Sequence, residues 1–287
     1  MSVNPAASIH ARLLERAKRD GVDFNLMLAR YALERWLYRL SISQARGEFM
    51  LKGALLFDLW FDVPHRPTRD ADFLGFGSAN AQVLTRTVQT ICRISADDGI
   101  QFNPDSVNTT EIRKEANYDG LRVKFIGTLG RARCPMQLDI GYGDAVTPGP
   151  EEADYPILLD DFPAPRLRVY PRETVVAEKL EAIIKLGMVN SRMKDYFDLW
   201  VLLRSAAFDT ALLGKAIAST CMRRNTDLPA TTPLGLSDEF AQSATKRTQW
   251  SAFLRKNTLK APALDNVVKE LRDALAEPLA QARSYRQ

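Results

Sequence analysis

The stretch RPTRDADFLGFG, Arg66–Gly77, carries two carboxylates on a short segment that otherwise has the pattern of a buried β-strand. Alternate side chains of a strand share a face, so Asp70 and Asp72 point the same way. Two close carboxylates repel each other, and burying them without a partner is costly. A divalent cation relieves both problems, because hard cations take oxygen ligands. The alternative is an exposed strand end, where each aspartate pairs with Arg66 or Arg69.

A third carboxylate interrupts a later apolar strand, PMQLDIGYGD. Asp139 shares one face with Gln137, and the opposite face carries Met136, Leu138 and Ile140. If this strand neighbours the first, three carboxylates converge on one face. Such a set can hold two magnesium ions, or hold one and act as base for an attacking hydroxyl. Both the adjacency and the choice between these roles stay open at this point.

A Lys-Gly turn precedes the aspartate pair, in the segment FMLKGALLF. Gly53 would let a phosphate group approach the backbone closely, and Lys52 would offer it a point charge. The alternative is an ordinary turn between a strand and a helix.

The pattern along the chain predicts an α/β (α+β) protein, with a mixed sheet and helices in front and an all-helical region behind. Helices are expected over 8–21, where Ser8 would be the cap, and over 25–43 and 79–99. Strands are expected around residues 100–144. Proline-rich and acidic loops over 147–156 and 160–166 suggest a boundary, which gives domains over 1–165 and 166–287.

The composition of the chain argues against several classes of protein. The net charge of +4 over 287 residues is mildly basic, which permits nucleic-acid binding without proving it. The three cysteines are far apart and form no CxxC, which argues against a zinc site or a disulfide framework. Neither a signal-peptide core nor a membrane-length apolar run is present, so we expect a cytoplasmic protein without a membrane partner.

In the helical half, the segment VVAEKLEAIIKLG places Lys179 at the edge of an apolar stripe, where it either snorkels or reaches an anion. RMKDYFDLWVLL is apolar nearly all round, with Asp195 and Asp198 one turn apart on the same side. These aspartates either form a structural ion pair with Arg192 or Lys179, or Asp195 orients Lys179 or the base of a nucleotide. The segment TKRTQWSAFLRKNTLK is either an amphipathic helix or a basic surface that stacks on RNA bases through Trp250.

Five motifs in a fixed order, over residues 49–203, resemble the AbiEii-type nucleotidyltransferase toxins of the DNA polymerase β-like nucleotidyltransferase superfamily. The motifs are FMLKGALLF, RPTRDADFLG, QLDIGYGD, VVAEKLEAIIKL and RMKDYFDLW. The resemblance implies a toxin that uses Mg²⁺ (or Mn²⁺) to transfer NMP from an NTP to an RNA acceptor, the 3′ end of tRNA, and so blocks translation. It also implies a cognate antitoxin protein as partner. The alternatives are a non-catalytic, degenerate nucleotidyltransferase that binds RNA or protein, and a transferase that acts on a protein hydroxyl.

The resemblance also assigns roles to residues. The metal ligands it implies are Asp70, Asp72 and Asp139, and the catalytic set adds Lys179 and Asp195. The nucleotide-binding residues it implies are Lys52, Gly53, Arg69, Lys179, Arg192, Lys194 and Asp198. We expect the nucleotide in a cleft between the two regions. One departure from the family pattern is the turn Gly53-Ala54-Leu55, which offers no hydroxyl to a phosphate, so backbone N–H groups would have to hold it.

Overall fold

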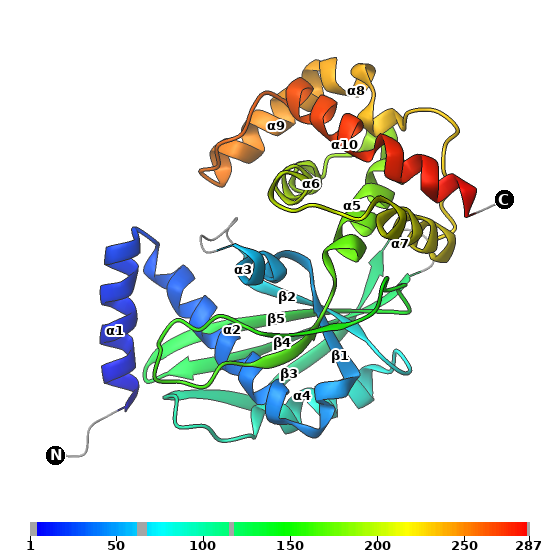
Figure 1. Ribbon diagram of the computed structural model, residues 1–287. Helices are drawn as coiled ribbons and strands as arrows, with labels where there is room; N and C mark the ends of the chain where they lie inside the picture. The colour runs from blue at the N-terminus through cyan, green and yellow to red at the C-terminus, as the bar shows by residue number, and fades with distance from the viewer. Residues whose placement is uncertain (1–4, 62–67, 115–117, 286–287) are drawn as a thin grey trace. The chain divides into compact units, whose positions relative to one another are not determined.

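The computed structural model describes residues 5–61, 68–114 and 118–285, and the chain forms two compact units (Figure 1). Unit 1 comprises Met1–Gly143 and Glu151–Val169, and unit 2 comprises Asp144–Pro150 and Tyr170–Gln287. Unit 1 is mixed α/β and unit 2 is helical, which confirms the fold class. Compactness does not establish independent folding, so the domains over 1–165 and 166–287 stay a prediction.

The helices of unit 1 follow the expected apolar periodicity. They are α1 (Pro5–Asp20), α2 (Phe24–Ile42), α3 (Leu56–Trp60) and α4 (Ala81–Cys92). Side-chain caps satisfy exposed N–H groups at two of the helix starts, because Asp23 accepts from Leu26 N and Asn80 accepts from Gln82 N and Val83 N. Ser8 was expected to cap the first helix, but α1 already includes Pro5, so Ser8 lies inside it.

A seven-stranded mixed sheet forms the centre of unit 1, in the order β3-β4-β5-β2-β1-β7-β6. Its strands are β1 (Phe49–Lys52), β2 (Asp70–Gly75), β3 (Ile100–Lys114), β4 (Tyr118–Leu129), β5 (Ala132–Tyr142), β6 (Glu151–Asp154) and β7 (Arg166–Val169). The pairs β2/β5 and β1/β7 are parallel, and the other neighbours are antiparallel.

Two short strands correct the expectation of a loop boundary. β6 lies inside the segment expected to be a loop, and it pairs with β7, which follows the predicted boundary at residue 165. Each strand has four residues; β6 is the edge strand of the sheet and β7 is its neighbour. Strands this short carry too few alternations to stand out from a polar, proline-rich background.

One face of the sheet is apolar and packs against α2. The residues Leu51, Phe73, Ile140 and Leu121 lie abreast on four adjacent strands, and all are buried. Trp36 of α2 contacts the rings of Phe73 and Phe125 at centroid distances of 6.0 and 5.8 Å. This face therefore supplies the core of unit 1, and the alternation of side chains places Asp70, Asp72 and Asp139 on the opposite face.

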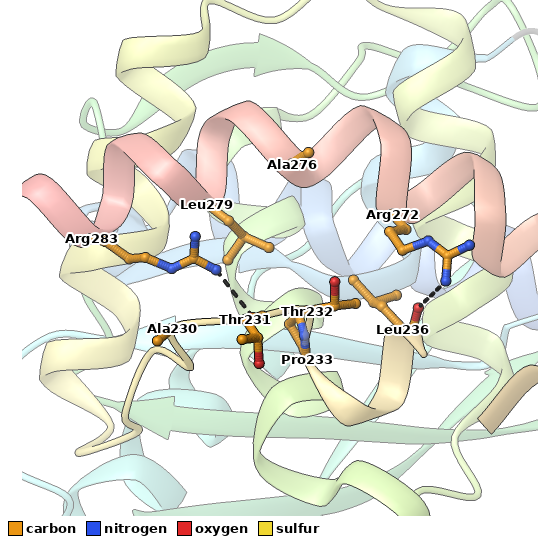
Figure 2. A pocket seen from close by; sticks show the side chains of 9 residues that line it. All are labelled: Ala230, Thr231, Thr232, Pro233, Leu236, Arg272, Ala276, Leu279 and Arg283. Atoms are coloured by element: carbon orange, nitrogen blue, oxygen red, sulfur yellow. Dashed lines mark hydrogen bonds between the residues drawn. The ribbon is translucent and has the colours of Figure 1, made fainter. Parts of the chain in front are cut away.

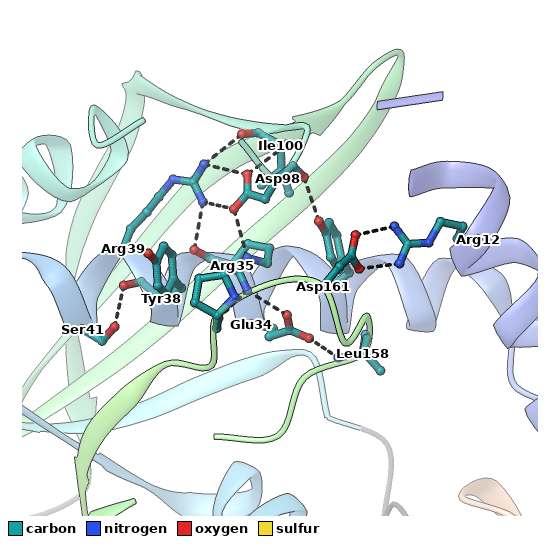
Figure 3. A network of polar contacts seen from close by, with 12 residues as sticks. Arg12, Glu34, Arg35, Tyr38, Arg39, Ser41, Asp98, Ile100, Leu158 and Asp161 are labelled. Atoms are coloured by element: carbon teal, nitrogen blue, oxygen red, sulfur yellow. Dashed lines mark hydrogen bonds and ion pairs between the residues drawn. The ribbon is translucent and has the colours of Figure 1, made fainter. Parts of the chain in front are cut away.

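A buried ionic network fixes α2 within unit 1 (Figure 3). Arg39 donates to both carboxylate oxygens of Asp98, at 2.6 and 2.9 Å, and Arg35 donates to the same group at 3.0 Å. Glu34 accepts from the backbone N–H of Leu158 at 2.7 Å, and burial raises the pKa of Glu34 to about 7. These ionisable groups hold distant segments together, and their mutual pairing accounts for their burial.

Unit 2 consists of packed helices. They are α5 (Arg172–Leu186), α6 (Met193–Ser205), α7 (Thr210–Arg223), α8 (Asp238–Gln242), α9 (Ala244–Lys256) and α10 (Leu264–Ser284). Trp250 of α9 is 2% exposed, and its indole N–H donates to the carbonyl oxygen of Pro262. Its ring therefore belongs to the core and is not available to stack on an RNA base, whereas phosphate contacts by the basic residues of this segment stay a prediction.

A cavity of about 170 Å³ lies between α10 and the segment before α8 (Figure 2). Arg272 and Arg283 lie at its two ends. Arg272 donates to Asp238, and Arg283 donates to the carbonyl oxygens of Pro229 and Thr231. These contacts fasten the 229–238 segment to α10, which gives both arginines a structural role.

Candidate functional site

A row of four charged residues crosses the polar face of the sheet. In register, Lys52 of β1 lies beside Asp72 of β2, Asp72 lies beside Asp139 of β5, and Asp139 lies beside Arg122 of β4. Residues in register on adjacent strands lie abreast on the same face, and neighbouring strands are about 4.8 Å apart. Two carboxylates are therefore flanked by two cations. The adjacency of β2 and β5, which the sequence left open, is a feature of the structure.

Asp70 lies on the same face, two residues before Asp72. Its register partner on β5 is Gln137, which in turn pairs with Lys124 on β4. Burial raises the pKa of Asp70, and the negative charges of Asp139 and Asp72 raise it further. The three carboxylates thus influence one another through space. Where neighbouring carboxylates make one another harder to ionise, a bound cation relieves their repulsion, so such a site is suited to a cation.

Asp139 is held by a two-point ion pair. The Nε and Nη2 atoms of Arg122 donate to its two carboxylate oxygens, at 2.8 and 2.6 Å. Within the described part of the chain, no group of three or more His, Cys, Asp or Glu side chains is arranged to hold a metal ion. The expected three-carboxylate site is therefore not assembled in this conformation. Asp139 as a metal ligand stays a prediction.

Asp70 and Asp72 alone still fit a magnesium ion. Mg²⁺ is commonly bound by one or two carboxylates together with substrate phosphates and water. The pair offers hard oxygen donors on one face of one strand. Of the arginines considered as alternative partners, Arg66 lies outside the described residues. Arg69 is exposed and makes no ion pair with either aspartate among the described residues.

Gly53 lies directly against the carboxylate of Asp72. Its φ angle is +76°, and a Cβ atom at this position would lie 2.3 Å from Asp72 Oδ2. The turn continues as a 3₁₀ turn, Gly53–Leu55, into α3. The glycine is thus required for two reasons, because an L side chain strains this backbone and would displace the carboxylate.

We expect Gly53→Ala to impair both folding stability and metal binding. The left-handed φ costs about 1–2 kcal/mol for alanine, and the clash with Asp72 adds to this. Gly21→Ala is the matched control, since its φ is +63° and its Cβ would meet nothing within 4 Å. Thermal melting and Mn²⁺ titration of both variants check this. Equal metal affinity in the two variants would contradict the role given to the Gly53–Asp72 contact.

The charged residues of unit 2 that the family resemblance names meet in a second cluster. Lys179 of α5 donates to Asp198 at 2.6 Å and to Asp195 at 3.2 Å, and both aspartates lie on α6. Arg192 donates to the other oxygen of Asp195 at 2.6 Å. Burial alone would raise the pKa of Asp195, but the charges of Lys179 and Arg192 hold it below its usual value. Lys179 thus reaches anions, and the structural ion pair is present.

Two further lysines of the predicted set lie next to these groups, Lys52 in register with Asp72 and Lys194 beside Asp195 in sequence. Lys194 is exposed on α6, next to the cluster in sequence, and Lys52 is 9% exposed at the end of β1. The sequence places Arg122 near a turn and a strand, where it favours a structural role over substrate binding, so Arg122 is not among the predicted site residues. The signal was present in GLRVKF, where Arg122 and Lys124 alternate with buried Leu121 and Val123, so that both face the carboxylates.

Comparison with known families decides the classification. A family model described as "Nucleotidyl transferase AbiEii toxin, Type IV TA system" matches residues 35–277, which is most of the chain. The chain belongs to the AbiEii toxin family. It is therefore a nucleotidyltransferase of a family of type IV toxin–antitoxin systems, as the motif order predicted. Family membership also implies an NTP, a divalent metal and an antitoxin partner.

Two solved structures resemble this AbiEii protein. JHP933 from Helicobacter pylori has 16% sequence identity and a TM-score of 0.48, and the match covers 88% of this chain and 92% of that one. A candidate nucleotidyltransferase from H. pylori has 16% identity and a TM-score of 0.49, with 88% and 95% covered. No curated protein matches the sequence. Among the described residues, no helix combines the length and the apolar character needed to span a bilayer.

Proposed function

We propose that this AbiEii protein transfers NMP from an NTP to the 3′ end of an RNA, with tRNA as the acceptor and Mg²⁺ (or Mn²⁺) as the cation. Blocked translation in the cytoplasm is the proposed consequence. The observation that carries the proposal is the pair Asp70 and Asp72, which share the polar face of β2 beside Gly53. The acceptor follows from the family resemblance, and the mildly basic net charge of +4 is compatible with it.

In unit 1, different residues would bind the metal ion and the phosphates of the NTP. Asp70 and Asp72 would hold the ion, which supplies charge neutralisation at the transferred phosphoryl group. Lys52 and the backbone of Gly53 would face the phosphates, with Arg69 near the start of β2 as a further cation. Asp139 is available as third ligand or as base for the acceptor hydroxyl once Arg122 leaves it.

The cluster in unit 2 supports a second group of roles. Lys179 would contact the phosphates where charge develops as pyrophosphate leaves. Asp195 and Asp198 would orient its ammonium group, from which both already accept hydrogen bonds. Arg192 would keep Asp195 ionised, and Lys194 would add positive charge for the nucleotide.

A labelling experiment tests the proposal. The protein is incubated with each α-³²P-labelled NTP, total bacterial RNA and cell extract, with Mg²⁺ or with EDTA. We expect Mg²⁺-dependent label on RNA of tRNA size, which periodate oxidation of the RNA 3′ end abolishes. Label on protein alone would favour the transferase that acts on a protein hydroxyl. A complete lack of label with every NTP would favour the non-catalytic binder, and either result would overturn the proposal.

A further inference from the structure

We infer that the guanidinium of Arg122 takes the place of the catalytic cation at the carboxylate of Asp139. Tight binding of the metal ion then depends on the nucleotide. The inference rests on the proposed function, because it assumes that the carboxylates of β2 and β5 bind a divalent ion. It concerns a residue to which neither the motifs nor the family match assigns a role.

The geometry of the ion pair supports this assignment. Arg122 engages both oxygens of Asp139 through Nε and Nη2. Such a two-point contact uses the lone pairs that a metal ion would need on the side facing the arginine. The Asp139 side chain is 15% exposed, so solvent does not readily replace the guanidinium. A cation that binds Asp139 through these same lone pairs must therefore displace Arg122.

The charges of the row explain why displacement would need a nucleotide. Lys52, Arg122 and Lys124 oppose Asp70, Asp72 and Asp139, so the charges of this face cancel and leave too little negative charge to bind a divalent ion tightly. The phosphates of an NTP would add negative charge and give the guanidinium a new partner with the same bidentate geometry. Arg122 is 35% exposed, so its side chain can turn without opening the core.

Lys124 is a second cation on the same strand as Arg122. It is exposed on β4 and shares the polar face with Arg122, two residues away. Its charge lowers the pKa of Asp70, as does the charge of Arg122, although burial and the neighbouring carboxylates have the larger, opposite effect. β4 therefore presents two cations to the carboxylate face, and only Arg122 is bound to a carboxylate in the described residues.

Direct Mn²⁺ binding tests the inference without reference to catalysis. Electron paramagnetic resonance of free Mn²⁺ is used to titrate the wild type, Arg122→Gln and Arg122→Lys, each with and without a mixture of the four α,β-methylene ribonucleoside triphosphates. Arg133→Gln is the matched control, since Arg133 is exposed on the same face of β5, six residues from Asp139. Melting temperatures confirm that each variant is folded.

We expect wild-type protein to bind Mn²⁺ weakly alone and more tightly with the nucleotide analogues. Arg122→Gln should bind Mn²⁺ alone about tenfold more tightly than wild type, the effect of removing one positive charge about 6 Å from a divalent ion in water. Arg122→Lys should lie between them, because lysine keeps the charge and loses the two-point contact. The gain should vanish when Asp139→Asn is added to Arg122→Gln, and Arg133→Gln should match wild type.

Two results would overturn the inference, and they are distinguishable. If Arg122→Gln binds Mn²⁺ no more tightly than wild type, while wild type binds it with nucleotide, Arg122 does not compete with the ion and the proposed function stands. If no variant binds Mn²⁺ even with nucleotide, the carboxylates are not a metal site, and the proposed function fails together with the inference.

Discussion

The wild-type chain should arrest bacterial growth when it is expressed without its antitoxin, and Asp72→Asn should abolish that arrest. Asparagine keeps the size and shape of aspartate and loses the charge that would hold the cation beside Gly53. A metal ligand of this kind contributes several kcal/mol to the transition state, so we expect NMP transfer to fall by roughly 1,000-fold.

Stability should move in the opposite direction from activity in this variant. Asp72 is flanked by Asp139 in register and shares a face with Asp70. Removing its charge relieves repulsion among three carboxylates, at the cost of the attraction to Lys52. The melting temperature should therefore be equal to that of wild type or slightly higher, which excludes unfolding as the cause of lost toxicity.

Asp154→Asn is the matched control for this experiment. Asp154 lies on β6 of the same sheet, and its side chain is 61% exposed beside Arg166. An exposed pair of this kind contributes little, so the control should arrest growth as wild type does. A soluble Asp72→Asn protein that is as toxic as wild type, at matched expression, would falsify the catalytic interpretation and favour the non-catalytic binder.

Lys179→Ala will lose activity and stability together, so the single variant does not separate catalysis from folding. The ammonium group is bound to two buried carboxylates, Asp195 and Asp198. Removing one partner from a buried ion pair costs about 3–5 kcal/mol, because the remaining charges are uncompensated. The position of Lys179 at the edge of the apolar stripe would by itself suggest a milder effect.

The double variant Lys179→Met with Asp198→Asn separates the two roles. It removes the cation together with its closer anion, and Asp195 keeps its contact with Arg192 at 2.6 Å. We expect the melting temperature to recover most of the loss seen in Lys179→Ala. Transfer activity should stay at least about 100-fold below wild type, the usual effect of losing one charge contact to a transition state.

Lys185→Ala serves as the control on the same helix, since Lys185 is exposed on α5. It should match wild type in melting temperature and in labelled product. If the double variant is stable and transfers NMP as fast as wild type per folded molecule, Lys179 is purely structural, and the role that the family resemblance gives it is wrong.

Local periodicity determined which side chains share a face. Alternation along a strand placed Asp70 and Asp72 on one face, and helical spacing placed Asp195 and Asp198 on one side of α6. Both are properties of the backbone within a few residues, so no tertiary contact is needed to predict them. The α/β region in the first part of the chain and the helical region after it were predictable from the same local patterns, and the family from the resemblance of its ordered motifs.

Long-range pairing decided the rest, because nothing local states which strands become neighbours. The order of strands in the sheet places β5 between β4 and β2. Asp139 of β5 therefore lies beside Asp72 and forms its ion pair with Arg122 of β4. The short strands β6 and β7 likewise gain their hydrogen bonds from each other and, for β7, from β1.

Gly53 shows the difference between what the local sequence predicts and what tertiary contacts decide. From the sequence, the glycine could be explained by a phosphate that approaches the backbone. The structure adds a partner from another strand, the Asp72 carboxylate, which leaves no room for a Cβ atom. The sequence alone determined that two carboxylates face one way after a glycine turn. Only the tertiary structure decided what surrounds them, because the free energy of strand pairing depends on contacts between segments far apart in the chain.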